Sequence, residues 1–332
     1  MGLPFVSIII VNWNGKEFLK DCLTSIRKIN YEKSKYEVIL VDNGSTDGSV
    51  EFVEKNFPWV KIVKLKKNYG FAKGNNIGAR VAKGEYLVFL NNDTMVTKDW
   101  LINLVRPMEK NEKIGSCTSK ILFYTEKNKI NAVGGKKSIF GINYSIGENE
   151  DKNKFKKPFP VFFPQGCSMI IRKDVFKKIG KFDEDFFCLE EDSDLGWRLW
   201  NNKYKVMAEP SSIVYHRASA TYKKMKVYES WIFYLYPRNS LMSMFKNARM
   251  RDLVWMLPLF FSTIGFELIF FSLVGKREIV KAIIKGVKDF FKKYWKKTMK
   301  KRKKIPKTGY ANKFIAGFES ISEIIPRTKK YL

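Results

Sequence analysis

The chain has 332 residues, 45% of them hydrophobic, and its 62 lysines and arginines against 33 acidic residues give a formal net charge of +29. This apolar content supports a folded core and excludes wholesale disorder. The length allows one large α/β domain with an appendage, or two smaller domains. The charge predicts an anionic partner, which is nucleic acid, a phosphate-rich ligand or an anionic lipid surface. A lysine-rich genome is the plain alternative, although such a bias usually raises glutamate as well.

Strand and helix patterns alternate through the first hundred residues. Short apolar runs rich in β-branched residues predict strands at 6–11, 37–41, 60–65 and 86–90. Helical periodicity follows the first and third of these strands, at 18–26 and 77–82. Such alternation predicts βαβ units and a mostly parallel sheet flanked by helices.

The first apolar run and the cysteines indicate a reducing compartment. The run ends at Val11 and has no basic flank, so it is too short for a secretory signal, and we expect it to be a strand. The four cysteines form no C-x-x-C motif and are expected to be free thiols. The catalytic part of the chain is therefore expected to stay in the cytoplasm.

The second hundred residues are less regular. An amphipathic helix is expected at 100–108, but the stretch 115–164, rich in Gly, Lys and Asn, gives no strand that can be placed. Beyond it, the patterns predict a strand at 167–171, helices at 174–179 and 190–201, and strands at 206–208 and 213–215.

The tail differs in composition, which predicts domains at 1–248 and 249–332. Residues 253–274 are almost entirely apolar and would form a helix of about 33 Å, long enough to cross a bilayer. Glu267 opposes a simple span, because a carboxylate in the bilayer costs at least about 2.5 kcal/mol. The basic run that follows suits anionic lipid, at about 1 kcal/mol per basic residue. Since one span would place the catalytic part outside, we expect an in-plane or hairpin attachment.

Polar clusters follow three of the predicted strands, at 12–14, 42–43 and 91–93. Ligands of open α/β sheets bind beyond the carboxyl ends of the strands, so the three together predict a nucleotide-type site. One cluster alone would be explained equally well by an ordinary turn or helix cap. The loop 68–78 could offer free N–H groups to phosphate, but it matches neither the P-loop nor the dinucleotide fingerprint. Those mismatches argue against a kinase, an ATPase or an NAD enzyme.

Eight sequence motifs follow one another along the chain. They are VSIIIVNWNG, VILVDNGSTDGS, NYGFAKGNNIG, YLVFLNND, QGCSMIIRKDVF, GKFDEDFF, LEEDSDLGWR and VYHRAS. In this order they resemble the motifs of family 2 glycosyltransferases of the GT-A fold, most closely the rhamnosyltransferase-like branch, over roughly residues 5–248. The resemblance implies an inverting, metal-dependent transferase of a hexosyl or deoxyhexosyl unit from a nucleotide-diphosphate sugar, with residues 1–95 as the donor half and 96–248 as the acceptor half.

The resemblance also implies the roles of individual residues on the donor side. Asn91–Asp93 stands where the family carries an Asp-x-Asp motif, so Asp93 would hold Mn²⁺ or Mg²⁺, with His216 as a second ligand. An imidazole ligand would favour Mn²⁺. A satisfied, partly buried histidine is the alternative for His216. The residues implied for the nucleotide are Asn12, Asn14, Asp42, Asn68, Gly70 and Asn92.

The acidic run 190–194 would carry the general base. On a helix, Asp192 shares an apolar face with Leu195 and Leu199, so it would point inward, whereas Asp194 and Arg198 would form a pair either at the surface or just behind the site. Dipole stabilisation of the helix start would explain the acids equally well, but the resemblance implies that Asp192 is the base. Two tryptophans of this helix, 197 and 200, are expected to border the acceptor site.

The expected partners follow from the resemblance and the tail. They are a nucleotide-sugar donor, a glycan or lipid-linked glycan acceptor, and an anionic membrane surface at the cytoplasmic face of the cell membrane, with no nucleic acid. The alternative is a basic protein that binds nucleic acid or a lipid surface on a degenerate transferase fold. It is weakened because the densest basic block follows an apolar stretch and no nucleic-acid motif is found.

Overall fold

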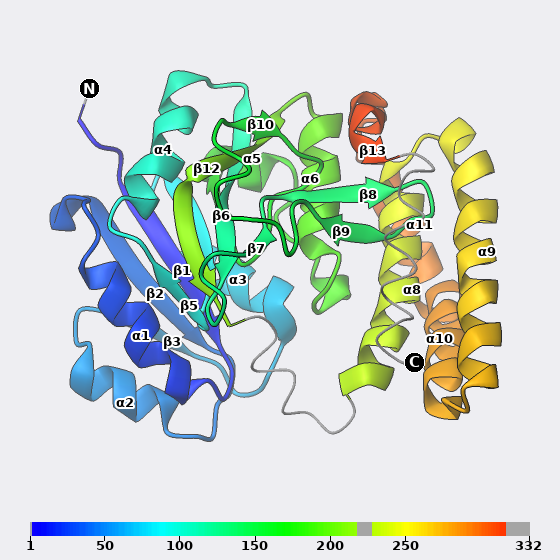
Figure 1. Cartoon of the computed structure of the whole chain (residues 1–332), viewed down its shortest axis with the longest axis horizontal. Helices are drawn as coiled ribbons and strands as arrows, with labels where there is room; N and C mark the ends of the chain where they lie inside the picture. Colours follow the sequence, from blue (N-terminus) through cyan, green and yellow to red (C-terminus); the bar gives the residue numbers. More distant parts are fainter. Residues whose placement is uncertain (1, 218–227, 317–332) are drawn as a thin grey trace.

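The computed structural model describes residues 2–217 and 228–316, and it places an α/β unit beside a group of long helices (Figure 1). A ten-stranded sheet forms the centre of the α/β unit, in the order β10-β12-β6-β11-β4-β1-β2-β3, with β5 and β7 at the sides of β12 and β6. The first four strands are parallel, as the alternation predicted, and are β1 (Val6–Asn12), β2 (Tyr36–Asp42), β3 (Lys61–Lys64) and β4 (Tyr86–Asn91).

The second half of the sheet is mixed. Strand β11 (Ser168–Arg172) runs antiparallel to both of its neighbours, whereas β12 (Lys205–His216) is parallel to β6 (Ile114–Phe123). Two strands were expected along β12. They form one twelve-residue strand instead, whose register is interrupted between Glu209 and Ile213. The unplaced stretch 115–164 supplies most of β6 and four short strands: β7 (Ile130–Ala132), β8 (Gly135–Ser138), β9 (Asn143–Ser145) and β10 (Phe159–Pro160). Strand β5 (Thr94–Val96) pairs with the end of β12.

Helices cover both faces of the sheet. One face packs against α1 (Lys16–Arg27), α2 (Ser49–Asn56) and α4 (Trp100–Lys110). The other packs against α3 (Gly70–Val81), α5 (Lys173–Lys178) and α6 (Glu191–Asn201). Side chains alternate along β1, with Ile8 and Ile10 in the first core and Ile9 in the second, as a sheet buried on both faces requires.

The helical region at the C-terminal end packs against the α/β unit. It comprises α8 (Tyr228–Asn247), α9 (Met250–Leu273), α10 (Arg277–Asp289), a π-helical turn (Phe290–Tyr294) and α11 (Trp295–Arg302). Its buried apolar residues continue the core beneath α6, and Tyr310 stacks on Trp200 of that helix. A short strand, β13 (Ile315–Ala316), pairs with β8. The helices therefore begin before residue 248 and share a core with the sheet.

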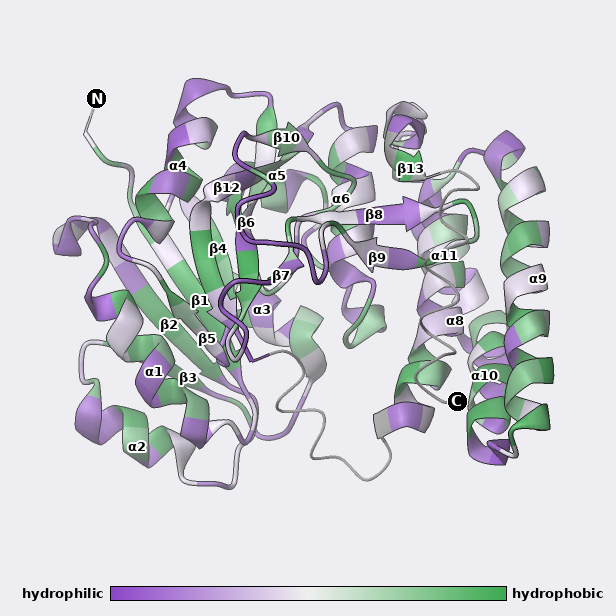
Figure 2. Ribbon diagram, in the orientation of Figure 1, coloured by the Kyte–Doolittle hydropathy of each residue, from purple (hydrophilic) through white to green (hydrophobic). Residues whose placement is uncertain are grey.

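Helix α9 is the one helix among the described residues that is long and apolar enough to cross a membrane. Its inward stripe, which includes Met256 and Phe260, is buried in the protein, and Glu267 is also buried on that side. Its outward stripe is apolar and open, with Val254 76% and Leu273 82% exposed. Figure 2 shows this largely hydrophobic helix along the outer edge of the molecule.

Candidate active site

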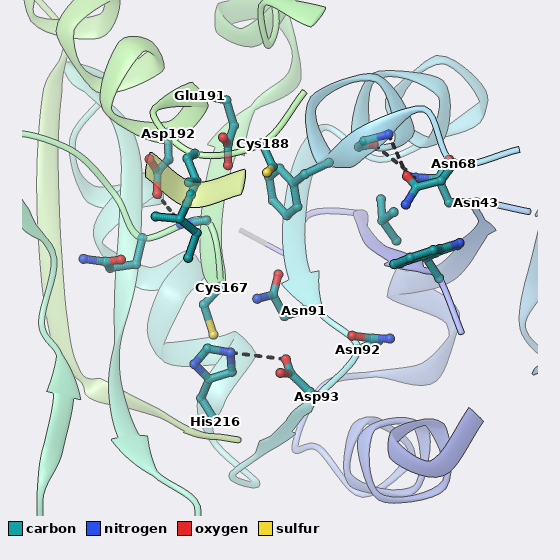
Figure 3. A pocket seen from close by; sticks show the side chains of 18 of the residues that line it. Asn43, Asn68, Asn91, Asn92, Asp93, Cys167, Cys188, Glu191, Asp192 and His216 are labelled. Atoms are coloured by element: carbon teal, nitrogen blue, oxygen red, sulfur yellow. Dashed lines mark hydrogen bonds and ion pairs between the residues drawn. The ribbon is translucent and has the colours of Figure 1, made fainter. Parts of the chain in front are cut away.

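A cleft of about 460 Å³ opens where the carboxyl ends of β1 and β4 meet the start of α6. Asp93, after β4, lies on one side of it, and Asp192, in the first turn of α6, lies on the other (Figure 3). The strand-end rule therefore located the cleft correctly from the sequence. The fold also meets the condition on which the expected chemistry depends, because the two carboxylates face one cavity.

Asp93 and His216 lie side by side at the bottom of the view in Figure 3, although 123 positions of chain separate them. Strand β12 ends beside β5, and the pairing of His216 with Thr94 brings the imidazole next to the carboxylate. His216 Nε2 is 3.2 Å from Asp93 Oδ1. Asn131 Oδ1 lies 3.2 Å from His216 Nδ1, and an acceptor there favours the tautomer with its proton on Nδ1. Nε2 is then the nitrogen available to a metal.

The Asp93 and His216 pair fits a divalent cation. Two ligands at right angles around an ion, each about 2.1 Å from it, lie about 3 Å apart, close to the spacing of these two atoms. The described residues contain no group of three or more His, Cys, Asp or Glu side chains that could hold a metal. The remaining ligands would therefore come from the donor diphosphate and water, as hard divalent cations commonly accept.

The pKa of His216 is raised well above its ordinary value. Burial lowers it, but Cys167 and Asp93, through charge and hydrogen bonds, raise it by more. Burial itself raises the pKa of the Cys167 thiol. A cation at this position would compete with a proton on the imidazole, so metal binding is expected to weaken as the pH falls.

Two backbone N–H groups donate hydrogen bonds to the Asp192 carboxylate at the N-terminal end of α6. The N–H of Gly166 donates to Oδ2 at 3.1 Å, and the N–H of Ser193 donates to Oδ1 at 2.7 Å. Burial raises the pKa of Asp192 to about 6, against the lowering effect of these hydrogen bonds, and the charge of Glu190 adds to the rise. A carboxylate that faces a cleft and has a pKa raised toward neutral pH is suited to accepting a proton.

The loop before α6 has an unusual backbone. Phe187, Leu189 and Glu190 all have positive φ, near 64°, 64° and 73°, which is a costly conformation for residues other than glycine. Asn239 of α8 stabilises this loop conformation, because its Nδ2 donates to the carbonyls of three loop residues, 186, 188 and 189. The helical region thus contributes directly to the position of Asp192.

Buried ion pairs surround the base. Lys137 of β8 is fully buried and 3.0 Å from Glu190. The pair of Asp194 and Arg198 forms as expected, and it lies behind the cleft rather than at the surface, because Asp194 is completely buried. Lys246 of α8 lies 2.7 Å from Asp194 Oδ1, which explains how that carboxylate tolerates burial.

The residues implied for the nucleotide divide into two groups. Asn68, Gly70 and Asn92 line the cleft. Asn12 and Asp42 are buried behind it, where Asn12 Oδ1 accepts from Asn92 Nδ2 at 2.7 Å and Asn12 Nδ2 donates to Asp42 at 3.3 Å.

Asn14 lies elsewhere, in a separate surface depression. Its Oδ1 accepts from the N–H of Thr46 at 2.8 Å, which ties the loop after β1 to the loop after β2.

The cleft also contains residues that sequence reasoning missed. Trp13 belongs to a polar cluster that did point here and Gln165 begins one of the eight matched motifs, but Trp231 carried no comparable signal. Trp231 comes from α8, far along the chain, and packs edge-on against Phe187 at 5.9 Å. Trp197 and Trp200, expected at the acceptor site, are 1% and 2% exposed and pack in the core beneath α6.

Comparison with curated proteins gives relatives that are glycosyltransferases. The poly-beta-1,6-N-acetyl-D-glucosamine synthase of Staphylococcus epidermidis is 26% identical over 211 residues, which are 63% of this chain and 48% of that protein. An uncharacterized glycosyltransferase of Haemophilus influenzae is 28% identical over 244 residues, covering 67% and 72% of the two chains. The chain thus spans about half the length of the staphylococcal relative.

Comparison with solved structures supports the GT-A-like fold. GalNAc-T7 with UDP, GalNAc and Mn²⁺ has a TM-score of 0.64 at 18% identity, covering 90% of this chain and 58% of that chain. A mannosyltransferase of Pyrobaculum calidifontis with GDP-Man and Mn²⁺ has a TM-score of 0.55 at 16% identity, covering 94% and 86%.

A family model, Glycosyl transferase family 2, matches residues 7–180, from the first strand of the sheet through α5. That match spans just over half of the 332 residues. This chain therefore belongs to glycosyl transferase family 2.

Proposed function

We propose that this chain is an inverting glycosyltransferase that moves a hexosyl or deoxyhexosyl unit from a nucleoside-diphosphate donor to a hydroxyl of a glycan acceptor. The observation that carries the proposal is the placement of Asp93 and Asp192 on opposite sides of one cleft. The narrower assignment to a rhamnosyltransferase-like branch rests on motif resemblance alone.

Asp192 is the general base in this proposal. As the acceptor oxygen bonds to the anomeric carbon, its proton passes to the Asp192 carboxylate, and the bond from that carbon to the diphosphate breaks. The nucleoside diphosphate leaves with the bonding electrons. One displacement, from the face opposite the leaving group, inverts the anomeric configuration. A base in this position typically contributes about 10²–10⁴-fold to the rate.

On the donor side, Asp93 and His216 would hold Mn²⁺ or Mg²⁺, and the imidazole favours Mn²⁺. Such a cation supplies charge stabilisation to the departing diphosphate. Asn68 and Gly70 would offer polar contacts to the nucleotide from the start of α3. Asn92 would contact the ribose, with Asn12 and Asp42 as its support rather than as direct contacts.

The test is a thermal-shift series with UDP and GDP, each with and without Mn²⁺, followed by transfer assays on two matched variants. Asp192→Asn should abolish transfer while the nucleotide still stabilises the protein. Asp174→Asn, also an acid in the first turn of a helix but far from the cleft, should behave as wild type. Failure of every nucleotide to stabilise the wild type would refute the proposal, and loss of nucleotide binding in Asp192→Asn would reassign that residue.

We also propose that the enzyme works at the cytoplasmic face of a membrane, on a lipid-linked acceptor. The outward stripe of α9 is apolar, and the exposed side of α10 and α11 carries many lysines, which together suit the surface of an anionic bilayer. Because its inward stripe is buried in the protein, α9 would lie in the membrane plane rather than span it. Helix α8 would link the membrane-facing helices to the cleft, because it packs on α10 and its Trp231 lines the cleft.

Vesicle flotation tests the membrane proposal. Ile269, 65% exposed on α9, is replaced by glutamate and compared with Asn56→Glu, which adds the same charge to an exposed position of α2. Wild type and Asn56→Glu should float with phosphatidylglycerol vesicles, and Ile269→Glu should lose most of that binding. Equal flotation of the two variants would contradict the proposal.

A further inference from the structure

A second cavity, here called the side pocket, adjoins the cleft at the base. It measures about 260 Å³ and is lined in part by Asn143, Tyr144, Phe163 and Tyr236. Asp192 lines both cavities, as do Gln165 and Glu191, so the side pocket adjoins the cleft at this carboxylate. The volume is below the range of about 300–1,000 Å³ of pockets for drug-sized ligands, so it suits a single ring.

The walls of the side pocket are aromatic and come from distant parts of the chain. Tyr144 lies on β9, Phe163 precedes β11, and Tyr236 lies on α8 and is 6% exposed. Tyr236 is supported from behind by Phe260 of α9, at 6.2 Å between ring centroids. Flat, rigid aromatic faces with a few polar groups between them are suited to the apolar C–H faces of a sugar ring.

Asn143 provides an oriented hydrogen-bond donor. Its Oδ1 accepts from Lys137 Nζ at 3.1 Å and from Ser193 Oγ at 3.1 Å. Since an ammonium can only donate, the oxygen of the amide must face it, and Nδ2 is the other end. Within residues 2–217 and 228–316, no hydrogen bond from Asn143 Nδ2 is found. The amide is thus fixed, with a donor left for a ligand oxygen.

The charge of the side pocket is opposite to that of the protein. Glu190, Glu191 and Asp192 line it, and no lysine or arginine does so among the described residues, although the chain as a whole carries +29. Lys137, which does not line the side pocket, neutralises the charge of Glu190 through an ion pair. Glu191 Oε2 is buried and has no hydrogen-bond partner within the described part of the chain. A carboxylate or phosphate on the ligand would face Glu191 and Asp192 with no basic side chain in the lining to compensate its charge.

We propose that the side pocket is the acceptor subsite and that it takes an uncharged sugar ring, whose attacking hydroxyl points at Asp192. Tyr144 and Tyr236 stack on the ring, and Asn143 Nδ2 donates to one of its oxygens. This inference rests on the proposed function, which it deepens by naming the acceptor class. Burial and the charge of Asp192 raise the pKa of Glu191 in the wall of the side pocket.

The experiment uses the full chain with its stabilising nucleotide sugar and compares p-nitrophenyl β-glucoside with p-nitrophenyl β-glucuronide, which differ at one carboxylate. Release of nucleoside diphosphate and saturation-transfer NMR report turnover and binding. The neutral glucoside should bind and accelerate release above donor hydrolysis, and the glucuronide should have a kcat/KM at least 10-fold lower. Binding of neither glycoside, or equal use of both, overturns the inference.

Variants separate the subsite from the rest of the site. Asn143→Ala and Tyr236→Leu should raise the KM for the glucoside about 10-fold and leave donor hydrolysis and nucleotide-induced stabilisation unchanged. Asn128→Ala, an exposed asparagine of the same region outside the pocket, is the matched control. An unchanged acceptor KM in both pocket variants also overturns the inference. Absence of donor hydrolysis in the wild type would instead refute the proposed function, on which the subsite depends.

Discussion

Lys246 of α8 forms ion pairs with two carboxylates of the α/β unit. Replacing it tests how much these pairs contribute to the free energy of unfolding. Its Nζ lies 2.6 Å from Asp183 and 2.7 Å from Asp194, and its side chain is 3% exposed. Removing one partner of a buried ion pair costs about 3–5 kcal/mol. Because Lys301 still pairs with Asp183 and Arg198 with Asp194, Lys246→Met should cost about 3 kcal/mol, at the low end.

At roughly 2 °C per kcal/mol for a chain of this size, the thermal midpoint should fall by about 6 °C. The control is Lys285→Met, the same change in a pair with Asp289 whose lysine is 61% exposed, with an expected cost below about 1 kcal/mol. A midpoint for Lys246→Met as high as that of the control would refute the reasoning.

The pH dependence of the Lys246→Met effect has a definite sign. Lys246 and other cations lower the pKa of Asp183 and of Asp194 against the opposing effect of burial. Carboxylates with lowered pKa values stabilise the fold above their ordinary pKa of about 4 and lose that contribution as the pH falls through the lowered value. The gap between wild type and variant should therefore be constant from pH 7 to 5 and narrow only in stronger acid.

Three further predictions concern the cleft. Transfer should need ionised Asp192, so kcat/KM should be flat above about pH 7 and fall below pH 6, and an acid limb near pH 4 would contradict this. Gly70→Ala should cost about 1–2 kcal/mol and weaken nucleotide binding, because φ is +84° and an added Cβ would lie 2.5 Å from Phe187 O; unchanged melting would count against it. Asn239→Leu should lower kcat at least 10-fold with nucleotide binding retained. Ser243→Ala, a buried control on the same helix whose Oγ has no hydrogen-bond partner among described residues, should not.

The donor half of the fold could be predicted from the sequence because its signals are local. Each of the first four strands is a short apolar run, and the polar residues that follow β4 lie in the cleft because parallel strands end at one edge. Asp93 was located by this rule alone. Its partner His216 was not, because its position depends on β12 pairing with β5 more than a hundred residues away.

The acceptor half could not be predicted because its contacts are distant and its strands short. Strands β7 to β10 have two to four residues each, too few for a periodic pattern, and two of them pair within a small sheet apart from the main one. Lys246 and Asn239 lie in a stretch where sequence alone gave no reason to expect buried polar groups. Helix α9 is apolar on all sides, so nothing in its sequence separated the buried stripe from the exposed one.

The distribution of charge explains why a cation is expected in the cleft. The exposed side of α10 and α11 carries many lysines, whereas within the described part of the chain no lysine or arginine lines the cleft. Asp93, Glu191 and Asp192 do line it. Among titratable side chains of acids, bases and histidine, a diphosphate entering there would meet these carboxylates and one imidazole. Since unbalanced negative charge in a partly buried site is costly, the donor must bring its own positive charge. In the proposed function, an ion beside Asp93 would therefore be a condition for donor binding itself.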